Sequence, residues 1–168
     1  MRLKQVIAIA VLLFIAFLVV FPPLASGGVN IALSSSSAVP VEHLYITIAE
    51  ISAHRADTRE PSGWFRVTNK TVQIDLVAVN LTQTITLSSL SPGQYDTIRL
   101  KLTNATATFN NTSRKVQLTS TVFTIPVSFF VGLASQARVV LNVSSDLRIA
   151  TETPSLSLSF AAAPTRTA

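Results

Sequence analysis

Alternation of apolar and polar side chains is the feature that most constrains the fold of this chain. After residue 28, no apolar pattern with the period of a helix extends over ten or more residues, whereas short runs with a period of two recur. Residues 41–53 and 97–102 are two examples. Because a two-residue period places alternate side chains on one face of a strand, the sequence predicts half-buried strands rather than helices.

Turn signals divide these runs into nine or ten short strands. Ser91-Pro92-Gly93 has the chemistry of a tight turn, and residues 110–113 are expected to form the tip of a hairpin. The alternation slips by one near Glu50-Ile51, which predicts a β-bulge, and Pro126 predicts a bulge or an edge strand. We therefore predict one all-β domain, an antiparallel β-sandwich of 8–10 strands with an immunoglobulin-like or prealbumin-like arrangement.

The last strands supply the remaining core positions. Val139, Leu141 and Val143 form an inward row, which leaves Asn142 pointing outward. The side chains expected to close the core are Ile149, Leu156, Leu158 and Phe160.

The first 28 residues have the layout of a secretory leader. Arg2 and Lys4 precede an unbroken apolar run over residues 6–21, and a short segment rich in small residues follows. We predict a signal peptide over 1–27, with cleavage near Gly27 or Gly28. The alternative is an uncleaved signal anchor, although the 16 apolar residues fall short of the roughly 20 that span a bilayer. In both cases the rest of the chain is expected outside the cytoplasm.

The same patterns predict four segments. The leader over 1–27 is followed by an N-terminal strand with a Ser-rich hinge over 28–40 and by the sandwich over 41–160. The tail over 161–168 has no pattern and is predicted to be disordered.

Composition excludes several classes of function. Charged residues make up only 12% of the chain, about half the usual ~25%. The few basic residues are scattered, which excludes a nucleic-acid footprint. The chain has no cysteine, which excludes disulfides, thiol catalysis and Cys-ligated metals, and its two histidines exclude a three-His zinc site. We predict no cofactor.

Asparagines that open an N-x-S/T sequon are strongly over-represented. Six of the seven asparagines do so, and they are Asn69, Asn80, Asn104, Asn110, Asn111 and Asn142. In a secreted chain this excess predicts N-glycosylation at several sites. A surface of hydroxyls and glycans changes little with pH because few groups titrate, which favours an acid or hot setting such as an archaeal cell envelope.

Several segments together resemble a largely uncharacterised family of secreted archaeal and bacterial domains, catalogued as domain of unknown function 4382. The segments are Val41–His54, Trp64, residues 72–77 with Asp75-Leu76, Ser91–Leu100 and, less tightly, Val139–Leu147. Of these, SPGQYDTIRL at Ser91–Leu100 is the most specific. The resemblance spans about Val29 to Ile149 and implies an extracellular β-sandwich, without implying a reaction.

The arrangement of the N-terminal region is also similar to that of archaeal surface threads, in which an extended N-terminal strand fills a groove in the neighbouring subunit. Val29, Ile31 and Leu33 are the candidate donor-strand side chains, and residues 34–37 are the candidate hinge. Our first hypothesis is therefore an extracellular, N-glycosylated structural protein of the cell surface, a filament subunit that assembles by strand donation. Its partners would be copies of itself or cell-envelope components, with the membrane touched only through an uncleaved leader. The alternative is that this strand pairs within its own sandwich.

The second hypothesis is a monomeric secreted ligand-binding module, for instance one that binds carbohydrate. Trp64 is the candidate stacking residue, with Tyr45 or Tyr95 on an exposed face. A Trp that begins a strand also fits a core anchor, so both interpretations of Trp64 stay open.

Catalytic chemistry finds no support in the sequence. His43 and His54 are an odd number of residues apart, so they face opposite sides of a strand unless a bulge resets the alternation, and we predict no shared metal site. Asp75 and Arg99 both lie in core-like strands, and we interpret them as a buried ion pair that fixes strand register. No nucleophile elbow, phosphate loop or dinucleotide fingerprint is present. We predict that the protein is not an enzyme.

Overall fold

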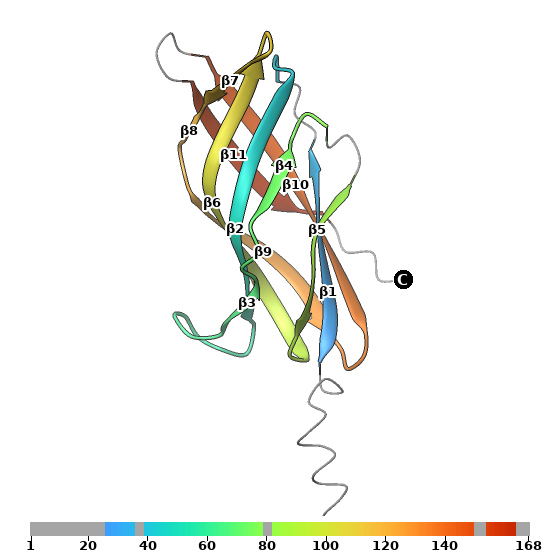
Figure 1. Ribbon diagram of the computed structural model, residues 1–168. Coiled ribbons are helices and arrows are strands. Elements are labelled where there is room, and N and C mark those ends of the chain that lie inside the picture. Colours follow the sequence, from blue (N-terminus) through green and yellow to red (C-terminus); the bar gives the residue numbers. More distant parts are fainter. Residues whose placement is uncertain (1–25, 36–38, 79–81, 150–153, 164–168) are drawn as a thin grey trace, which may run out of the picture.

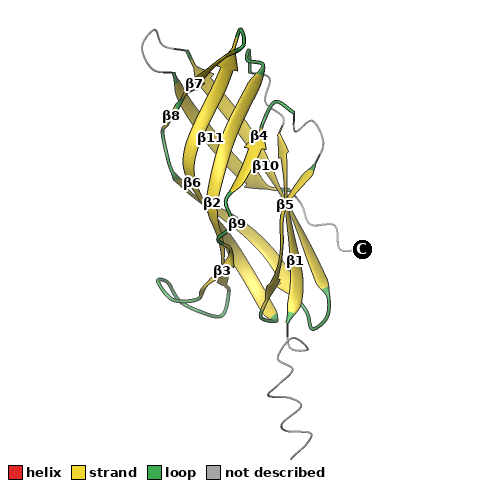
Figure 2. Ribbon diagram, in the orientation of Figure 1, coloured by secondary structure: helices red, strands yellow, loops and turns green. Residues whose placement is uncertain are grey.

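The fold is all-β, as predicted, with two sheets packed face to face (Figure 1, Figure 2). The computed structural model describes residues 26–35, 39–78, 82–149 and 154–163. These residues form β1 (Gly27–Ser35), β2 (His43–Arg55), β3 (Trp64–Thr68), β4 (Val72–Asp75), β5 (Gln83–Leu90), β6 (Gly93–Phe109), β7 (Thr112–Lys115), β8 (Gln117–Leu118), β9 (Val122–Val131), β10 (Gln136–Arg148) and β11 (Ser155–Ala162).

The first sheet has the order β5-β1-β10-β11-β8. The second sheet has the order β3-β2-β6-β7, with β4 also paired to β2 and β9 also paired to β6. Most neighbours are antiparallel, but β1 runs parallel to β10 and β11 runs parallel to β8. A parallel neighbour cannot be joined by a tight hairpin, so β1 and β10 are brought together from opposite ends of the chain.

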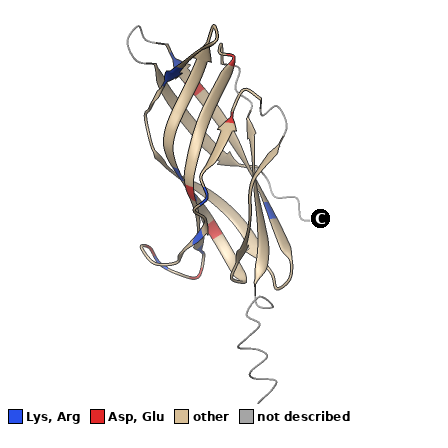
Figure 3. Ribbon diagram, in the orientation of Figure 1, with Lys and Arg blue, Asp and Glu red and all other residues tan. Residues whose placement is uncertain are grey.

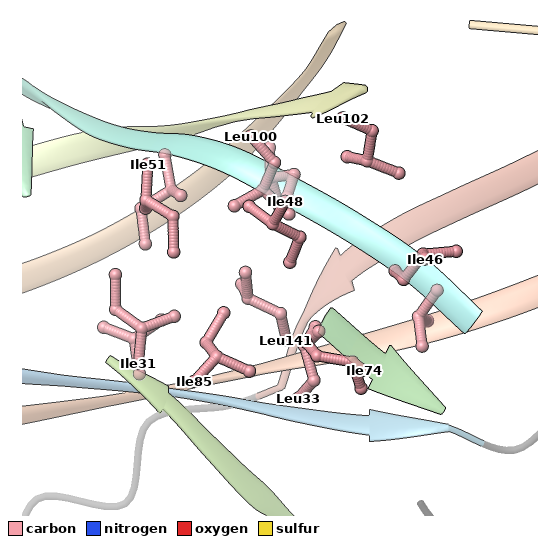
Figure 4. Close-up of a cluster of buried hydrophobic side chains, with 14 of the residues drawn as sticks. Ile31, Leu33, Ile46, Ile48, Ile51, Ile74, Ile85, Leu100, Leu102 and Leu141 are labelled. Atoms are coloured by element: carbon pink, nitrogen blue, oxygen red, sulfur yellow. The ribbon is translucent and has the colours of Figure 1, made fainter. Parts of the chain in front are cut away.

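The core lies between the two sheets and is built from the predicted alternating rows. Ile31 and Leu33 of β1 face Ile48 and Ile51 of β2 across the sandwich, and all four side chains are fully buried or nearly so (Figure 4). Burying a side chain of this size stabilises the fold by about 1.5–3 kcal/mol. The cluster continues through β6, β9, β10 and β11, so one core holds both sheets together.

The predicted β-bulge in β2 is confirmed. The pairing of β2 with β6 shifts register between Ile48 and Glu50, and the buried row moves from even positions before the shift to Ile51 and Ala53 after it. The bulge resets the alternation of outward side chains too, so His43 and His54 both lie on the outer face of the second sheet, at opposite ends of β2.

Both predicted turns are present. Asn110 and Asn111 connect β6 to β7 with φ values of 47° and 60°, the positive values that a two-residue type I′ hairpin turn requires. The segment 91–93 joins β5 to β6. Pro126 lies on β9, which among the described strands pairs only with β6, next to a register shift between Tyr95 and Thr97. Pro126 therefore combines the two features that the sequence predicted for it.

Tyr95 ties the turn at 91–93 to the core. Its ring is fully buried and stacks on Phe129 at a centroid distance of 5.2 Å, and its hydroxyl donates a hydrogen bond of 2.9 Å to the backbone carbonyl of Ser91. This is the arrangement of a tyrosine corner, in which a strand-initiating Tyr bonds to the backbone a few residues upstream. Burial raises the pKa of Tyr95 above its usual value.

Three expectations about boundaries and core differ from the structure. The N-terminal strand at 28–40 is no separate segment, because β1 pairs with β5 and β10 inside the first sheet. β11 runs to Ala162, two residues into the predicted tail. Ile149 is 58% exposed rather than part of the core, because it follows the last residue of β10. The leader at 1–25, hinge residues 36–37 and residues 164–168 lie outside the described residues.

Candidate functional site

The slot filled by β1 is the first candidate site. Val29, Ile31 and Leu33 are all 0% exposed and point into the core, as the alternation predicted. In this single chain they fill a slot between β5 and β10 of their own sandwich, the alternative that the sequence left open for this strand. β1 aligns with β10 from Gly28 opposite Gln136 to Ser35 opposite Val143.

The two neighbours of β1 are distant from it in sequence. β1 pairs antiparallel with β5, from Gly27 opposite Leu90 to Leu33 opposite Gln83, with an irregularity after Ile31. Without β1, β5 and β10 would each present a row of unpaired backbone N–H and C=O groups beside an open apolar groove. The slot therefore suits a strand with apolar side chains at alternate positions, and in this structure the chain's own β1 fills it.

The sequons lie mostly on the surface. Asn69, Asn110, Asn111 and Asn142 are exposed, and Asn104 is half-buried on β6. Asn80 lies outside the described residues. Asn142 lies outside the row of Val139, Leu141 and Val143, as predicted.

Trp64 lies on the outer face of the second sheet and is no core anchor. The guanidinium carbon of Arg99 is 3.6 Å from the centre of the indole ring, and the His54 ring packs against the indole at a centroid distance of 5.1 Å. A cation placed in this way is attracted to the aromatic face. Arg99 therefore occupies a ring face that a sugar would need.

The charged side chains around Trp64 form a belt across the middle of the second sheet (Figure 3). Arg66 lies 3.6 Å from Glu50, and Arg99 lies 3.9 Å from Glu60. A shallow hollow of about 220 Å³ lies beside them, lined by Glu50, Ser52, Arg99, Lys101 and Val122. Most of these groups already have a partner within the belt, so the arrangement is that of a solvated, mutually paired surface.

His54 is a structural residue. It is 5% exposed; its Nδ1 lies 2.9 Å from the Asp96 carboxylate and its Nε2 lies 3.0 Å from the Ser62 carbonyl oxygen. A carbonyl oxygen only accepts hydrogen bonds, so Nε2 donates to Ser62 and holds the β2–β3 loop against the sheet. The hydrogen bond from His54 lowers the pKa of Asp96 below its usual value.

Asp75 pairs with His43 and not with Arg99, so the predicted Asp75–Arg99 ion pair is wrong. His43 Nδ1 lies 2.6 Å from Asp75 Oδ2, while Asp75 Oδ1 accepts the backbone N–H groups of Leu44 and Val77 at 3.0 and 3.1 Å. β4 pairs with the first half of β2, whereas Arg99 pairs with Ser52 in the second half. Asp75 still fixes the register of β4 against β2, but it does so through His43 and the backbone of Leu44.

The tyrosines divide between the two faces. Tyr45 lies on the outer face, half-buried, and its ring stacks on His43 at a centroid distance of 5.5 Å. Tyr95 is fully buried, so of the three aromatic residues that the ligand-binding hypothesis offered as alternatives it is the one that does not lie on an exposed face.

Sequence reasoning missed both His–Asp pairs. Their residues are 32 and 42 positions apart along the chain, and no local pattern marks such a pairing. Among the described residues, no group of three or more His, Asp or Glu side chains could hold a metal ion. Within the same residues, no helix is long and apolar enough to cross a membrane.

Comparison with known proteins gives one match. A family model described as a domain of unknown function (DUF4382) matches residues 26–158, from just before the start of β1 to the middle of β11. No curated protein and no solved structure matches the chain.

Proposed function

Because the chain belongs to the DUF4382 family, whose description assigns no activity, we propose a function from the fold itself: an extracellular, N-glycosylated structural protein of the cell surface whose copies join into a filament by donating β1. The observation that carries the proposal is the position of β1. It is the first described strand, it lies inside a sheet between β5 and β10, and both of these neighbours are distant in sequence.

Exchange of β1 between copies preserves every contact that β1 makes. The β1 strand of a second copy would offer the same backbone groups to β5 and β10 and place Ile31 and Leu33 in the same core. Donor and acceptor surfaces differ, so the contact is heterologous and propagates from copy to copy. Exchange therefore costs free energy mainly in the connection between β1 and β2, which must extend to reach the neighbouring copy, and not in the sheet.

The connection between β1 and β2 is long enough to place β1 in the sheet of an adjacent copy. Seven residues, 36–42, join Ser35 to His43, and an extended segment of that length spans about 25 Å. Strands in a sheet lie about 4.8 Å apart, so this reach is comparable with the width of a five-stranded sheet. Full extension would release the hydrogen bond from the Glu42 N–H to the Thr108 carbonyl oxygen.

A ligand-binding role has less support. Arg99 covers one face of Trp64, and Tyr95 is buried. The hollow at Glu50 and Lys101 is shallow and lined by side chains with mixed charge.

An engineered disulfide between β1 and β5 tests the proposal, and the chain has no cysteine of its own to interfere. Asn30 and Leu87 are partners in the antiparallel β1–β5 ladder. Directly opposed residues in such a ladder have Cα atoms about 4.5–5.5 Å apart, within the range that a disulfide bridges. We expect Asn30→Cys with Leu87→Cys, expressed as the full chain on cells, to form a ladder of crosslinked multimers that reducing agent collapses.

The matched control is Thr108→Cys with Ser113→Cys, a partner pair within the β6–β7 hairpin. This pair must crosslink within one chain, so it gives a single monomer band. If the β1–β5 pair also gives only an oxidised monomer, β1 stays in its own sandwich and the filament proposal fails.

A further inference from the structure

One end of the sandwich carries exposed apolar side chains that the fold does not use. Phe130 at the end of β9 is 64% exposed, and Leu133 in the β9–β10 turn is 65% exposed. Ala134 follows with a φ of 52°, also exposed. We refer to Phe130, Leu133 and Ala134 as the apolar cap.

The apolar cap is fixed to the point where the chain enters the domain. The Ala134 N–H donates to the Ser26 carbonyl oxygen at 3.3 Å, and the Gly28 N–H donates to the Ser135 carbonyl oxygen at 2.7 Å. Gly27 packs so closely that a Cβ there would lie 2.2 Å from the Gly132 carbonyl oxygen. The cap and the start of β1 therefore form one rigid surface, at the lower end of the molecule in Figure 1.

Phe130 leans over the same turn. A Cβ placed on Gly132 would lie 3.4 Å from Phe130 Cε1, so the Phe130 ring and the Leu133 turn are adjacent. Five large apolar side chains among the described residues are strongly exposed, and two of them, Phe130 and Leu133, flank this one turn. Their grouping at one place favours a contact surface there.

Apart from the β2–β3 loop, the strand starts and turns at this end carry no charge. Residues 5–41, 76–95 and 116–137 contain no Asp, Glu, Lys or Arg, and they include the start of β1 and the turns at 91–93 and 132–135. A charged pair lies on the flank, where Arg55 binds Asp57 through two hydrogen bonds beside Gly93. Uncharged strand starts and turns beside a charged loop match the transition from hydrocarbon to water at a membrane surface.

The sequence just before the described residues indicates what this end contacts. The apolar run at 6–21 precedes β1, and only residues 22–26 separate it from Gly27. Five extended residues reach about 17 Å at most. We propose that the leader takes the uncleaved alternative given above, so that residues 6–21 are retained as a membrane anchor, which Leu24 and Ala25 extend past the prolines. The apolar cap then inserts Phe130 and Leu133 into the surface of the lipid bilayer, so that the sandwich stands on the membrane at this end.

The proposed membrane contact does not depend on strand donation. Ser26 and Gly27 lie against the β9–β10 turn whichever copy supplies β1, because a donated strand occupies the same register. The connection from β1 to β2 leaves at the other end, near the β6–β7 hairpin, where the Asn111 N–H donates to Glu42. Failure of the crosslinking test above would leave the membrane proposal standing, and the reverse also holds.

Site-directed spin labelling of the full chain in phosphatidylglycerol–phosphatidylcholine vesicles tests the proposal. A nitroxide on Leu133→Cys should be reached several times more readily by oxygen, which concentrates in the bilayer, than by a water-soluble nickel chelate. The matched control is a nitroxide on Ser113→Cys in the β6–β7 hairpin, where the chelate should dominate. Both positions are exposed, so neither label disturbs the core.

Three outcomes would overturn the proposal. The label at 133 would show the same chelate access as the label at 113 if this end faces water. A broadened spectrum at 133 from spin–spin contact, lost on dilution with unlabelled protein, would show that a second copy covers the cap. Native protein whose mass lacks residues 6–21 would show that the anchor is removed.

A second variant tests the apolar cap directly. Phe130→Ser with Leu133→Ser should tilt the domain away from the bilayer and raise the access of the nickel chelate to a nitroxide on Gln136→Cys.

Discussion

At the scale of single residues, this chain uses its few charges to satisfy the backbone. Asp75 accepts hydrogen bonds from the N–H groups of Leu44 and Val77 and from His43, at the point where β4 meets β2. Burial raises the pKa of Asp75, but these three hydrogen bonds outweigh burial and hold the pKa below its usual value of 3.8. A carboxylate that accepts three donors is a structural clamp, so its ionisation is linked to folding.

Asp75→Ala is therefore expected to lower the free energy of unfolding at pH 7 by about 2 kcal/mol, because two backbone N–H groups lose their partner. Since the folded-state pKa of Asp75 lies below its unfolded value, its contribution is complete above about pH 4 and disappears as the pH falls through the folded-state pKa. Denaturant titrations between pH 2 and 7 should show the difference between variant and parent shrinking below pH 4. Asp146→Ala is the control, because Asp146 is exposed on β10 and its ion pair is with the exposed Arg148. An equal loss in both variants would contradict the clamp.

At the scale of elements, the inner face of β1 stabilises the fold, whereas its outer face carries a side chain that destabilises it. Ile31 is fully buried in the core, whereas the neighbouring Asn30 points to the outer face of the first sheet and has a buried Oδ1 without a hydrogen-bond partner among the described residues. Its flanking partners on β5 and β10 are Leu87 and Arg138. A polar oxygen without a partner is a cost that an apolar β-branched side chain would remove.

Ile31→Ala should lower the free energy of unfolding by about 3 kcal/mol, because it leaves a cavity in the core. Asn30→Val, one residue away, should raise the free energy of unfolding by about 1 kcal/mol. Guanidinium denaturation followed by the fluorescence of Trp64 measures both. The two variants should thus change the free energy of unfolding in opposite directions, because adjacent residues of β1 face opposite sides of the sheet. Two changes in the same direction would contradict this assignment of faces.

At the scale of the whole molecule, the two ends of the sandwich differ in chemistry. The β6–β7 hairpin ends in Asn110 and Asn111, both sequon asparagines and both exposed, and the opposite end carries the uncharged cap. A glycan at the hairpin would cover one end with sugar and leave the other end bare. This difference between the two ends suits a domain whose apolar end contacts the membrane and whose hairpin end faces water.

Thr112→Ala with Ser113→Ala removes both sequons and leaves the positive-φ asparagines of the turn unchanged. We expect native protein to carry glycan mass above the polypeptide and this double variant to lose part of it while it keeps its fold. Intact-mass measurement and glycopeptide mapping provide the check. A native mass equal to the 18.0 kDa polypeptide, or to that of the chain without its leader, would refute glycosylation.

Local patterns in the sequence were sufficient to predict the strands, the bulge in β2, the Asn110-Asn111 turn and the edge position of Pro126. Each of these depends on residues within a few positions of one another, because alternation, positive φ and the missing proline N–H are properties of a short segment. The inward row of Val139, Leu141 and Val143 belongs to the same class. For that reason the fold class and most of the core were correct before any strand was paired.

Only the tertiary structure decided which segments meet. β1 lies between β5 and β10, Asp75 pairs with His43 rather than Arg99, and Arg99 stacks on Trp64. Exposure is decided at the same level, since Phe130 and Leu133 resemble core residues by type, yet no other strand covers them. The physical reason is that period-two alternation assigns a side chain to a face but carries no information about the neighbouring strand, which the packing of the whole domain selects.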